Sequence, residues 1–285
     1  MTDAAAFEPH RGFLIGVAYR MLGSVSDAED VVQDAYLRWQ GADRAAVDDV
    51  RAYLARIVAR LCLDRLKSAR TRREHYVGTW LPEPLVEETS EPSTTAMADD
   101  LSVALMLTLE RLSPLERAAF LLHDVFDMDY SAIAGVLERT EAACRQLAAR
   151  AREHVRDGRP RFEPSPETEE RIASAFAAAA ARGDVDALAS LLAEDAVMYS
   201  DGGGKRVAAI HPIIGRERIM RFFAGVLSKP STPVPFEVRA TRINGLPGYV
   251  LRDETGVQTV TLELRDDHIA AIYVVRNPDK LRHLS

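Results

Sequence analysis

The chain has 285 residues, 47% of them hydrophobic, and a formal net charge of −7. This composition is typical of folded globular domains and excludes a largely disordered protein. The two cysteines, Cys62 and Cys144, each lie alone in a helical pattern, so the sequence predicts neither a disulfide framework nor a thiolate metal site. The apolar run at 13–22 is short and contains Arg20, which predicts a buried helix and not a signal peptide or membrane span. We therefore expect a cytoplasmic protein with two or three domains.

Charge is distributed unevenly along the first hundred residues. Residues 1–50 contain nine acidic and four basic residues, whereas residues 51–73 contain eight basic residues and a single acid, Asp64. Residues 76–100 contain six acidic residues and no Lys or Arg, and their Pro, Ser and Thr content indicates a linker. The negative net charge therefore does not exclude a nucleic-acid partner for the basic segment.

Helical modules are predicted on both sides of this linker. Residues 10–75 keep a 3.6-residue apolar period, and Ser26 with Glu29 has the spacing of a capping box for a helix that ends near Trp39. In the second module, about residues 101–155, helices are expected to start at Ser113, Asp129 and Thr140.

The remainder of the chain changes character after the prolines at 160–166. Helices are expected at 167–182, 185–193 and 215–227. Strands are expected at 207–210, 236–243, 248–252, 257–264 and 269–275. Helices followed by a strand-rich tail indicate an α+β domain.

Residues 129–155 have the pattern of a helix-turn-helix. A short helix is expected to direct its apolar side chains, Ile133, Val136 and Leu137, towards the interior. A turn follows at Glu138, and the longer helix after it has its apolar residues on one side. The opposite face combines small side chains, which permit close approach to base edges, with bidentate donors: Ala142, Arg145, Gln146, Ala149 and Arg150. A helical hairpin with a solvated basic face remains the alternative.

Two further helix faces carry one sign of charge. Basic side chains fall on one side of the helix at 51–73, where they could follow phosphates: Arg56, Arg60, Lys67 and Arg70. Acidic side chains lie within two turns of an earlier helix and suit a basic protein partner: Asp27, Glu29, Asp30 and Asp34. The alternatives are a solvated basic face and acids that stabilise a helix N-terminus.

The front half of the chain resembles the bacterial extracytoplasmic-function sigma factors. SDAEDVVQDAYLRW at 26–39 is similar to their region 2 helix that docks on the RNA polymerase clamp, and RAYLARIVARLCLDRLKSARTRRE at 51–74 to the part that melts and reads the −10 element. Residues 113–154 are similar to region 4, which reads the −35 element and contacts the polymerase flap. The resemblance implies a region 2 domain at 1–75, a linker at 76–100 and a region 4 domain at 101–160.

The resemblance also implies roles for individual residues. Core-polymerase binding is expected of Asp27, Glu29, Asp30, Val31, Gln33 and Asp34. Contact with the −10 element is expected of Arg56, Arg60, Lys67, Arg70, Arg72 and Arg73. Contact with the −35 element is expected of Arg139, Thr140, Ala142, Arg145, Gln146, Ala149 and Arg150. Glu138 departs from the family, which often has Gly at this turn, and a positive φ there would cost Glu on the order of 1 kcal/mol.

Three short motifs resemble the sigma-factor group that carries a C-terminal SnoaL-like extension. They imply regulatory contacts between domains by WLPEP (Trp80, Leu81, Pro82, Glu83, Pro84), DGGGK (Asp201, Gly202, Gly203, Gly204, Lys205) and NPDKL (Asn277, Pro278, Asp279, Lys280, Leu281). We expect the last domain, 161–285, to tune the activity of the two DNA-binding modules.

FAAAAARGDVDALASLLAEDAVMYSDGG at 176–203 resembles the start of SnoaL-like, NTF2-like folds, in which helices close over a curved sheet around a conical cavity. Some relatives are enzymes and others bind ligands or proteins. Catalysis would need Asp201, His211 or His268 beside Tyr199, and a sensor would bind an unknown small ligand in the cavity. We expect a non-enzymatic protein that is a monomer when free, needs no metal or cofactor, and has core RNA polymerase and promoter DNA, but no membrane, as partners.

Overall fold

The computed structural model describes residues 3–43, 47, 49–74, 76–87, 102–156, 164–228 and 235–284, without the side chains of 3, 67–74, 156 and 227. The described parts of residues 1–75 and 95–159 form one compact helical unit. Those of residues 76–94 and 160–285 form a second unit, which contains the sheet. The predicted order of helical modules followed by an α+β domain is confirmed.

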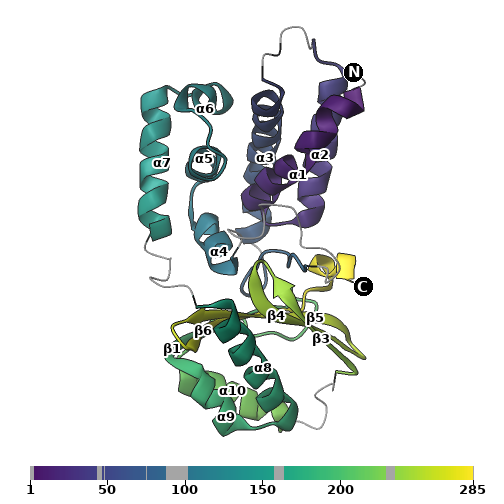
Figure 1. Ribbon diagram of the computed structural model, residues 1–285, viewed down its shortest axis with the longest axis vertical. Coiled ribbons are helices and arrows are strands. Elements are labelled where there is room, and N and C mark those ends of the chain that lie inside the picture. Colours follow the sequence, from purple (N-terminus) through teal and green to yellow (C-terminus); the bar gives the residue numbers. More distant parts are fainter. Residues whose placement is uncertain are drawn as a thin grey trace. The chain divides into compact units, whose positions relative to one another are not determined.

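The first helical module consists of three helices, α1 (Asp3–Leu22), α2 (Val25–Gln40) and α3 (Val50–Glu74), which pack side by side (Figure 1). The run at 13–22 is a buried helix, as predicted. The predicted capping box at Ser26 is wrong. Gly23, with φ of 69°, ends α1, and the side chain of the next residue, Ser24, accepts a hydrogen bond from the backbone N–H of Asp27 and caps α2.

The second helical module contains α4 (Val103–Arg111), α5 (Pro114–Phe120), the π-helical turn η2 (Leu121–Val125), α6 (Tyr130–Leu137) and α7 (Glu141–Arg156). The expected start at Ser113 is confirmed by a full capping box, in which Ser113 and Glu116 bond each other's backbone N–H groups. Burial of Ile133, Val136 and Cys144 holds α6 against α7, so these helices form the predicted helix-turn-helix.

The second unit is a six-stranded sheet with α8 (Pro166–Arg182), α9 (Val185–Leu191) and α10 (Arg216–Leu227) over one face (Figure 1). The strands, in the order β2-β1-β6-β5-β4-β3, are β1 (Leu192–Asp201), β2 (Ile213–Ile214), β3 (Glu237–Ile243), β4 (Leu246–Asp253), β5 (Gly256–Arg265) and β6 (His268–Val275). Only β1 and β6 pair in parallel within this sheet. The core between helices and sheet is apolar and includes Phe176, Met198, Ile219, Leu262 and Ile272.

One predicted strand is absent, and two strands of the sheet, β1 and β2, were not predicted. Residues 207–210 form no strand: Val207 and Ile210 are 87% and 61% exposed, and their carbonyls accept hydrogen bonds from the side chains of Arg276 and Thr79. Strand β1 is absent from the sequence prediction, which extended the preceding helix to 193. Its register shifts between Leu192 and Val197, and Glu194 and Asp195 are exposed there, which interrupts the alternation that marks a strand.

Residues 76–87 belong to the second unit and pack on its sheet domain. Val86 forms a β-bridge with Ile243, which lengthens the sheet beyond β3. Within the described residues, no helix is long and apolar enough to cross a membrane.

Candidate functional site

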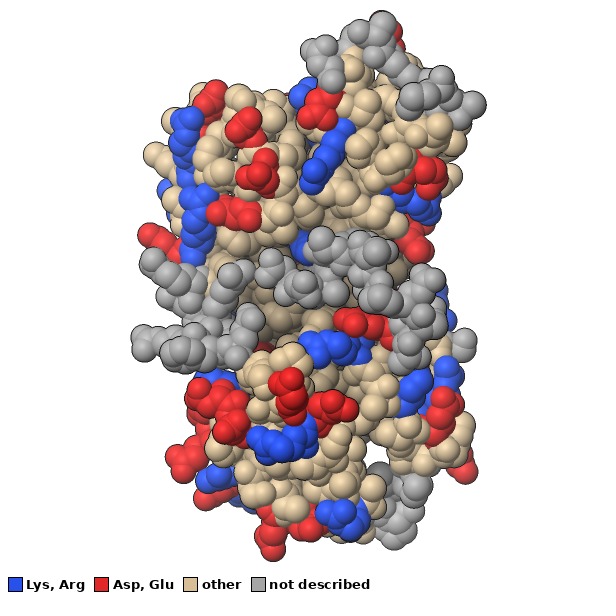
Figure 2. Space-filling model, in the orientation of Figure 1, with Lys and Arg blue, Asp and Glu red and all other residues tan. Residues whose placement is uncertain are grey.

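The exposed face of α7 is the one that the sequence predicts to read DNA. Ala142, Arg145, Gln146, Ala149 and Arg150 are exposed, whereas Cys144, Ala148, Ala151 and Val155 are buried against the rest of the module. Figure 2 shows Lys and Arg side chains in a column along α7. Arg145 is held by Glu141 at 2.8 Å and lies over the ring of Tyr130. The face is therefore basic, and one of its donors is already oriented.

Thr140 precedes α7 and caps it, since its hydroxyl accepts a hydrogen bond from the N–H of Ala143 at 3.2 Å. Arg139 and Thr140 directly precede the first residue of α7, Glu141, and both are exposed. They therefore lie at the N-terminal end of the helix, where free N–H groups favour a phosphate. Glu138 ends α6 in the left-handed region, with φ 54° and ψ 49°. The turn therefore has the positive φ at which Glu is disfavoured relative to Gly.

On α3, Arg56 and Arg60 are exposed on the side opposite the buried Leu54 and Val58. Arg60 is already engaged within the helical unit, since its guanidinium donates to the carbonyl of Gly135 at 2.9 Å. The structure does not describe the side chains of the other residues predicted to contact the −10 element, which are Lys67, Arg70, Arg72 and Arg73.

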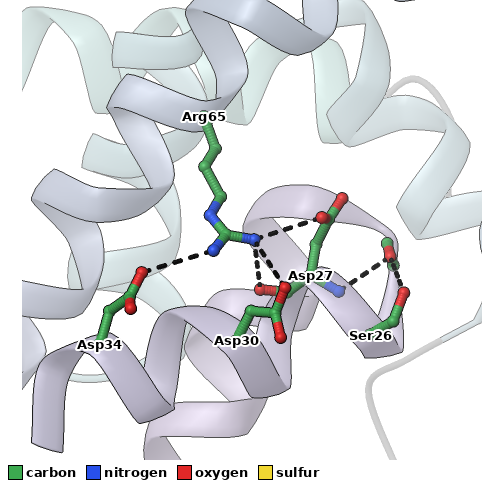
Figure 3. A network of polar contacts seen from close by, with 6 residues as sticks. Ser26, Asp27, Asp30, Asp34 and Arg65 are labelled. Carbon is green, nitrogen blue, oxygen red and sulfur yellow. Dashed lines mark hydrogen bonds and ion pairs between the residues drawn. The ribbon is translucent and has the colours of Figure 1, made fainter.

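The acidic side chains of α2 gather around one arginine of α3 (Figure 3). The Arg65 guanidinium lies 3.2 Å from Asp27, 3.6 Å from Asp30 and 3.4 Å from Asp34. Asp30 and Asp34 remain half or more exposed, at 71% and 50% of their side chains. One cation among three carboxylates leaves this surface acidic and fixes the spacing of the carboxylates.

Glu29 and Gln33 are also exposed on α2, but the prediction that Val31 contacts a partner is wrong. Val31 is 0% exposed because its position faces α1 and α3, and it contributes to the core. Sequence reasoning missed Leu37, which is 57% exposed. Its spacing from Asp30 and Asp34 puts it on their helix face, so the acidic surface has an apolar contact point. The signal available in the sequence was a Leu seven residues after Asp30 and three after Asp34, on the polar face of the helix.

Asp201, at the end of β1, is the centre of a buried cluster in the second unit. Its carboxylate accepts hydrogen bonds from the hydroxyl of Tyr76 at 2.6 Å and from the backbone N–H of Leu81 at 2.9 Å. The same carboxylate lies 2.8 Å from the ammonium of Lys280, with Asp201 fully buried. Residues of all three motif regions are therefore joined at one carboxylate.

Lys280 makes three contacts with the linker, one hydrogen bond and two cation–π contacts. Its ammonium donates to the backbone carbonyl of Leu81 and lies 4.2 Å from the ring centre of Trp80 and 5.0 Å from that of Tyr76. A cation over two aromatic faces, paired with a buried carboxylate, is a strong anchor. Burial and the hydrogen bond to Asp201 raise the pKa of Tyr76 far above its ordinary value, so this phenol remains a donor.

The glycine turn after Asp201 permits the approach of the NPDKL segment. Gly203 has φ of 61°, and a Cβ there would lie 2.3 Å from the side-chain nitrogen of Asn277. That nitrogen donates to the hydroxyl of Tyr76 at 2.8 Å. At Gly202 a Cβ would lie 2.1 Å from the carbonyl oxygen of Arg206. Gly202 therefore requires glycine because the backbone of Arg206 approaches too closely, and Gly203 because of its positive φ and the packed Asn277 side chain.

The rest of the three motifs surrounds this cluster. Lys205 and Asp279 form an ion pair at the surface, and the hydrogen bond from Lys205 lowers the pKa of Asp279. Leu81, Pro82, Glu83, Pro84 and Leu281 are buried, whereas Gly204 and Pro278 are exposed. The structure thus brings WLPEP, DGGGK and NPDKL together.

Three contacts of the linker were missed by sequence reasoning. Leu85 and Asn244 exchange hydrogen bonds, at 3.1 Å and 2.8 Å. A ring nitrogen of His283 lies 2.9 Å from the carbonyl of Pro84. The hydroxyl of Tyr76 donates to Asp201 and accepts from Asn277. No local pattern signals these contacts, because the partners are 125 or more residues apart.

The side chains considered for catalysis do not converge. Asp201, at the end of β1, lies opposite Val275 at the end of β6. His268 is the first residue of β6, seven residues before Val275, so roughly 23 Å of strand separates His268 from Asp201. Tyr199 stacks on Tyr273, its register partner, with ring centres 5.3 Å apart. Strand alternation puts both rings on the face opposite Met198 and Ile272, which pack against the helices. His211 is exposed in the loop before β2.

Comparisons with known proteins cover nearly the whole chain. Residues 6–72 match the family Sigma-70 region 2, residues 102–155 match Sigma-70, region 4, and residues 173–276 match the SnoaL-like domain. These families coincide with the first helical module, the second helical module and the sheet domain.

The chain is 38% identical over 292 residues to the ECF RNA polymerase sigma factor SigJ of Mycobacterium tuberculosis (strain ATCC 25618 / H37Rv), covering 98% of this chain and 93% of that protein. It is 32% identical to the probable ECF RNA polymerase sigma factor SigI of Mycobacterium tuberculosis (strain CDC 1551 / Oshkosh), over 98% and 94% of the two chains. The crystal structure of SigJ matches with a TM-score of 0.81 and 35% identity over 98% of each chain.

Proposed function

We propose that this chain, which belongs to the extracytoplasmic-function RNA polymerase sigma factors, reads promoters with α3 and α7 while its C-terminal unit tunes that activity by holding residues 76–87. As a sigma factor it acts with core RNA polymerase to direct promoter-specific transcription initiation. We further propose which residues perform each step and how the C-terminal unit regulates them.

The exposed face of α7 reads the −35 element. Ala142 and Ala149 let the helix approach base edges in the major groove, and Arg145 and Gln146 supply paired donors and acceptors to them. Arg139, Thr140 and Arg150 lie towards the phosphates and set the register of the helix. What supports this assignment is the combination of exposure on this face with burial of the opposite one.

Arg56 and Arg60, with the basic residues that follow on α3, contact the −10 element and the backbone of the separated strand. The acidic face of α2 docks on a basic surface of the polymerase clamp. Asp30 and Asp34 supply charge, Leu37 supplies apolar contact, and Arg65 sets the spacing of the carboxylates. Charge complementarity of this kind raises the association rate and is sensitive to salt.

Regulation by the C-terminal unit rests on one observation: a buried carboxylate, Asp201, and a buried ammonium, Lys280, both bind the backbone of Leu81. The two promoter-reading modules are connected through this linker. A linker held at one point limits the separations at which both modules can bind DNA at once, and so sets the effective concentration of one for the other. The C-terminal unit thus serves as a built-in regulator.

The unit performs this task without catalysis. The side chains between its helices and its sheet form an apolar core, and the candidate acid and base side chains lie apart from one another. Asp201 itself is occupied by the linker.

Transcription from a cognate promoter with purified core polymerase tests the proposal. We expect truncation after Arg161, and separately truncation before Asn277, to change the transcript yield of the holoenzyme. In the full chain, Asp201→Asn should change it in the same direction, whereas Glu254→Gln, an equal charge change at the exposed β4–β5 turn, should not. Unchanged yield in both truncations would overturn regulation by this unit.

A further inference from the structure

Arg60 connects the two helical modules. Its Nη2 donates to the carbonyl of Gly135 at 2.9 Å, and its Nε lies 3.4 Å from the carbonyl of Val136. Its Nη2 is also 3.1 Å from the carboxylate of Glu138. One guanidinium from α3 therefore meets three oxygen groups at the end of α6.

Together these oxygens resemble a phosphate group, which is the hydrogen-bond acceptor that arginine binds in nucleic acid. The last carbonyls of a helix have no partner within it and carry partial negative charge. Adding the Glu138 carboxylate gives a charged group with several oxygens, to which the planar guanidinium fork binds as it binds phosphate. Arg60 cannot direct the same donors to this group and to DNA at once.

The unusual residue at this turn fits such a pairing. Glu138 adopts φ 54°, a conformation in which a glycine would be unstrained. Glycine, however, would offer no carboxylate to Arg60. The pairing with Arg60 gives a physical reason for an acidic side chain at a position where backbone geometry favours glycine.

A second arginine makes the reciprocal contact in a buried setting. Arg117 of α5 donates to the carbonyl of Met21, near the end of α1, at 2.6 Å, and pairs with Glu110 at 2.7 Å. Its side chain is 3% exposed, whereas those of Arg60 and Glu138 are 45% and 77% exposed. Exposed pairs are weak and open to competitors, so the Arg60 contact is the one that a ligand can displace.

We propose that Glu138 and the last turn of α6 form a latch that holds the Arg60 guanidinium in the free chain and competes with promoter DNA for it. This inference rests on the DNA contact of Arg60 proposed above. Promoter binding then requires the latch to open, which separates α3 from α6 and leaves Arg60 available.

The first test uses the free full-length chain and needs no DNA. Dyes on cysteines introduced at the exposed positions Leu37 and His154 report the distance between the modules, because Cys62 and Cys144 are buried. We expect Glu138→Gln and Arg60→Gln each to lengthen this distance, and the double variant to match either one. Glu153→Gln, an equal charge change on α7, should leave the distance unchanged.

The second test measures promoter binding by the holoenzyme. We expect Glu138→Gln to tighten binding about two- to fivefold relative to Glu153→Gln, which corresponds to the strength of an exposed ion pair. Glu138→Gly should tighten it as well. Asp127→Gly, which relieves a comparable positive φ of 55° away from Arg60, should leave binding unchanged.

The outcomes separate this inference from the proposed function. Equal module distances in Glu138→Gln and Glu153→Gln would overturn the latch, even if Arg60→Gln weakens promoter binding and so supports the DNA contact. Because both variants open the latch, the DNA contact predicts weaker promoter binding by Arg60→Gln than by Glu138→Gln. A lengthened distance in both variants with equally tight promoter binding would refute the DNA contact, and the competition with it.

Discussion

Removing the negative charge of Asp201 should release the linker and destabilise the C-terminal unit. Asp201 is 0% exposed and Lys280 is 10% exposed at the side chain, so solvent screens their interaction little. Asp201→Asn leaves a buried ammonium without its carboxylate, a change that typically costs about 3–5 kcal/mol. Because Lys280 also contacts the carbonyl of Leu81 and the ring of Trp80, part of its environment remains, and we expect about 3 kcal/mol.

Denaturant unfolding followed by Trp80 fluorescence measures this effect. The chain has two tryptophans, so a Trp39→Phe background makes Trp80 the sole reporter of the linker. Asp201→Asn with Lys280→Met removes both charges and should recover most of the loss, which gives a double-mutant coupling energy. A loss below about 1 kcal/mol in Asp201→Asn, or additive effects in the double variant, would refute the reasoning.

Further predictions concern the DNA-binding face, the acidic face and a buried carboxyl. Arg145→Ala should weaken promoter binding by about 1–3 kcal/mol and relax the −35 preference, whereas Arg150→Ala should weaken all sequences alike and reduce the salt dependence, as titrations at several salt concentrations would show. Asp30→Asn should slow association with core polymerase at low salt, and a Glu170→Gln control should not. Burial raises the pKa of Glu263, so the stability that this group contributes is complete below its unfolded pKa of about 4.3 and is lost as pH rises through the folded value. Glu263→Gln should therefore stabilise the chain at about pH 8 but not at about pH 4, and an equal gain at both would contradict this assignment.

Local chemistry made parts of the fold predictable. At Ser113 the cap, Pro114 and Glu116 all favour the same helix start, and the structure has it there. At Ser26 the same pattern failed because the chain turns at Gly23 and Ser24 reaches the free N–H first. A capping box identifies a helix start only where no neighbouring residue can serve as the cap.

The two candidate sites also differ in how far the sequence predicts them. The face of α7 follows from helical periodicity, since buried and exposed positions alternate as predicted. The cluster around Asp201 could be expected only from the resemblance of three motifs, because Tyr76 and Asn277 are 201 residues apart in the chain. Val31 shows the opposite failure: a residue within a docking segment belongs to the core because its helix position faces inward.

Run-off transcription on a library of promoter sequences tests the central claim most directly. With purified core polymerase and the full-length chain, we predict transcripts that start at a selected promoter class and require both components, with a yield that Asp201→Asn changes and Glu254→Gln does not. No transcription above that of core polymerase alone would contradict the account.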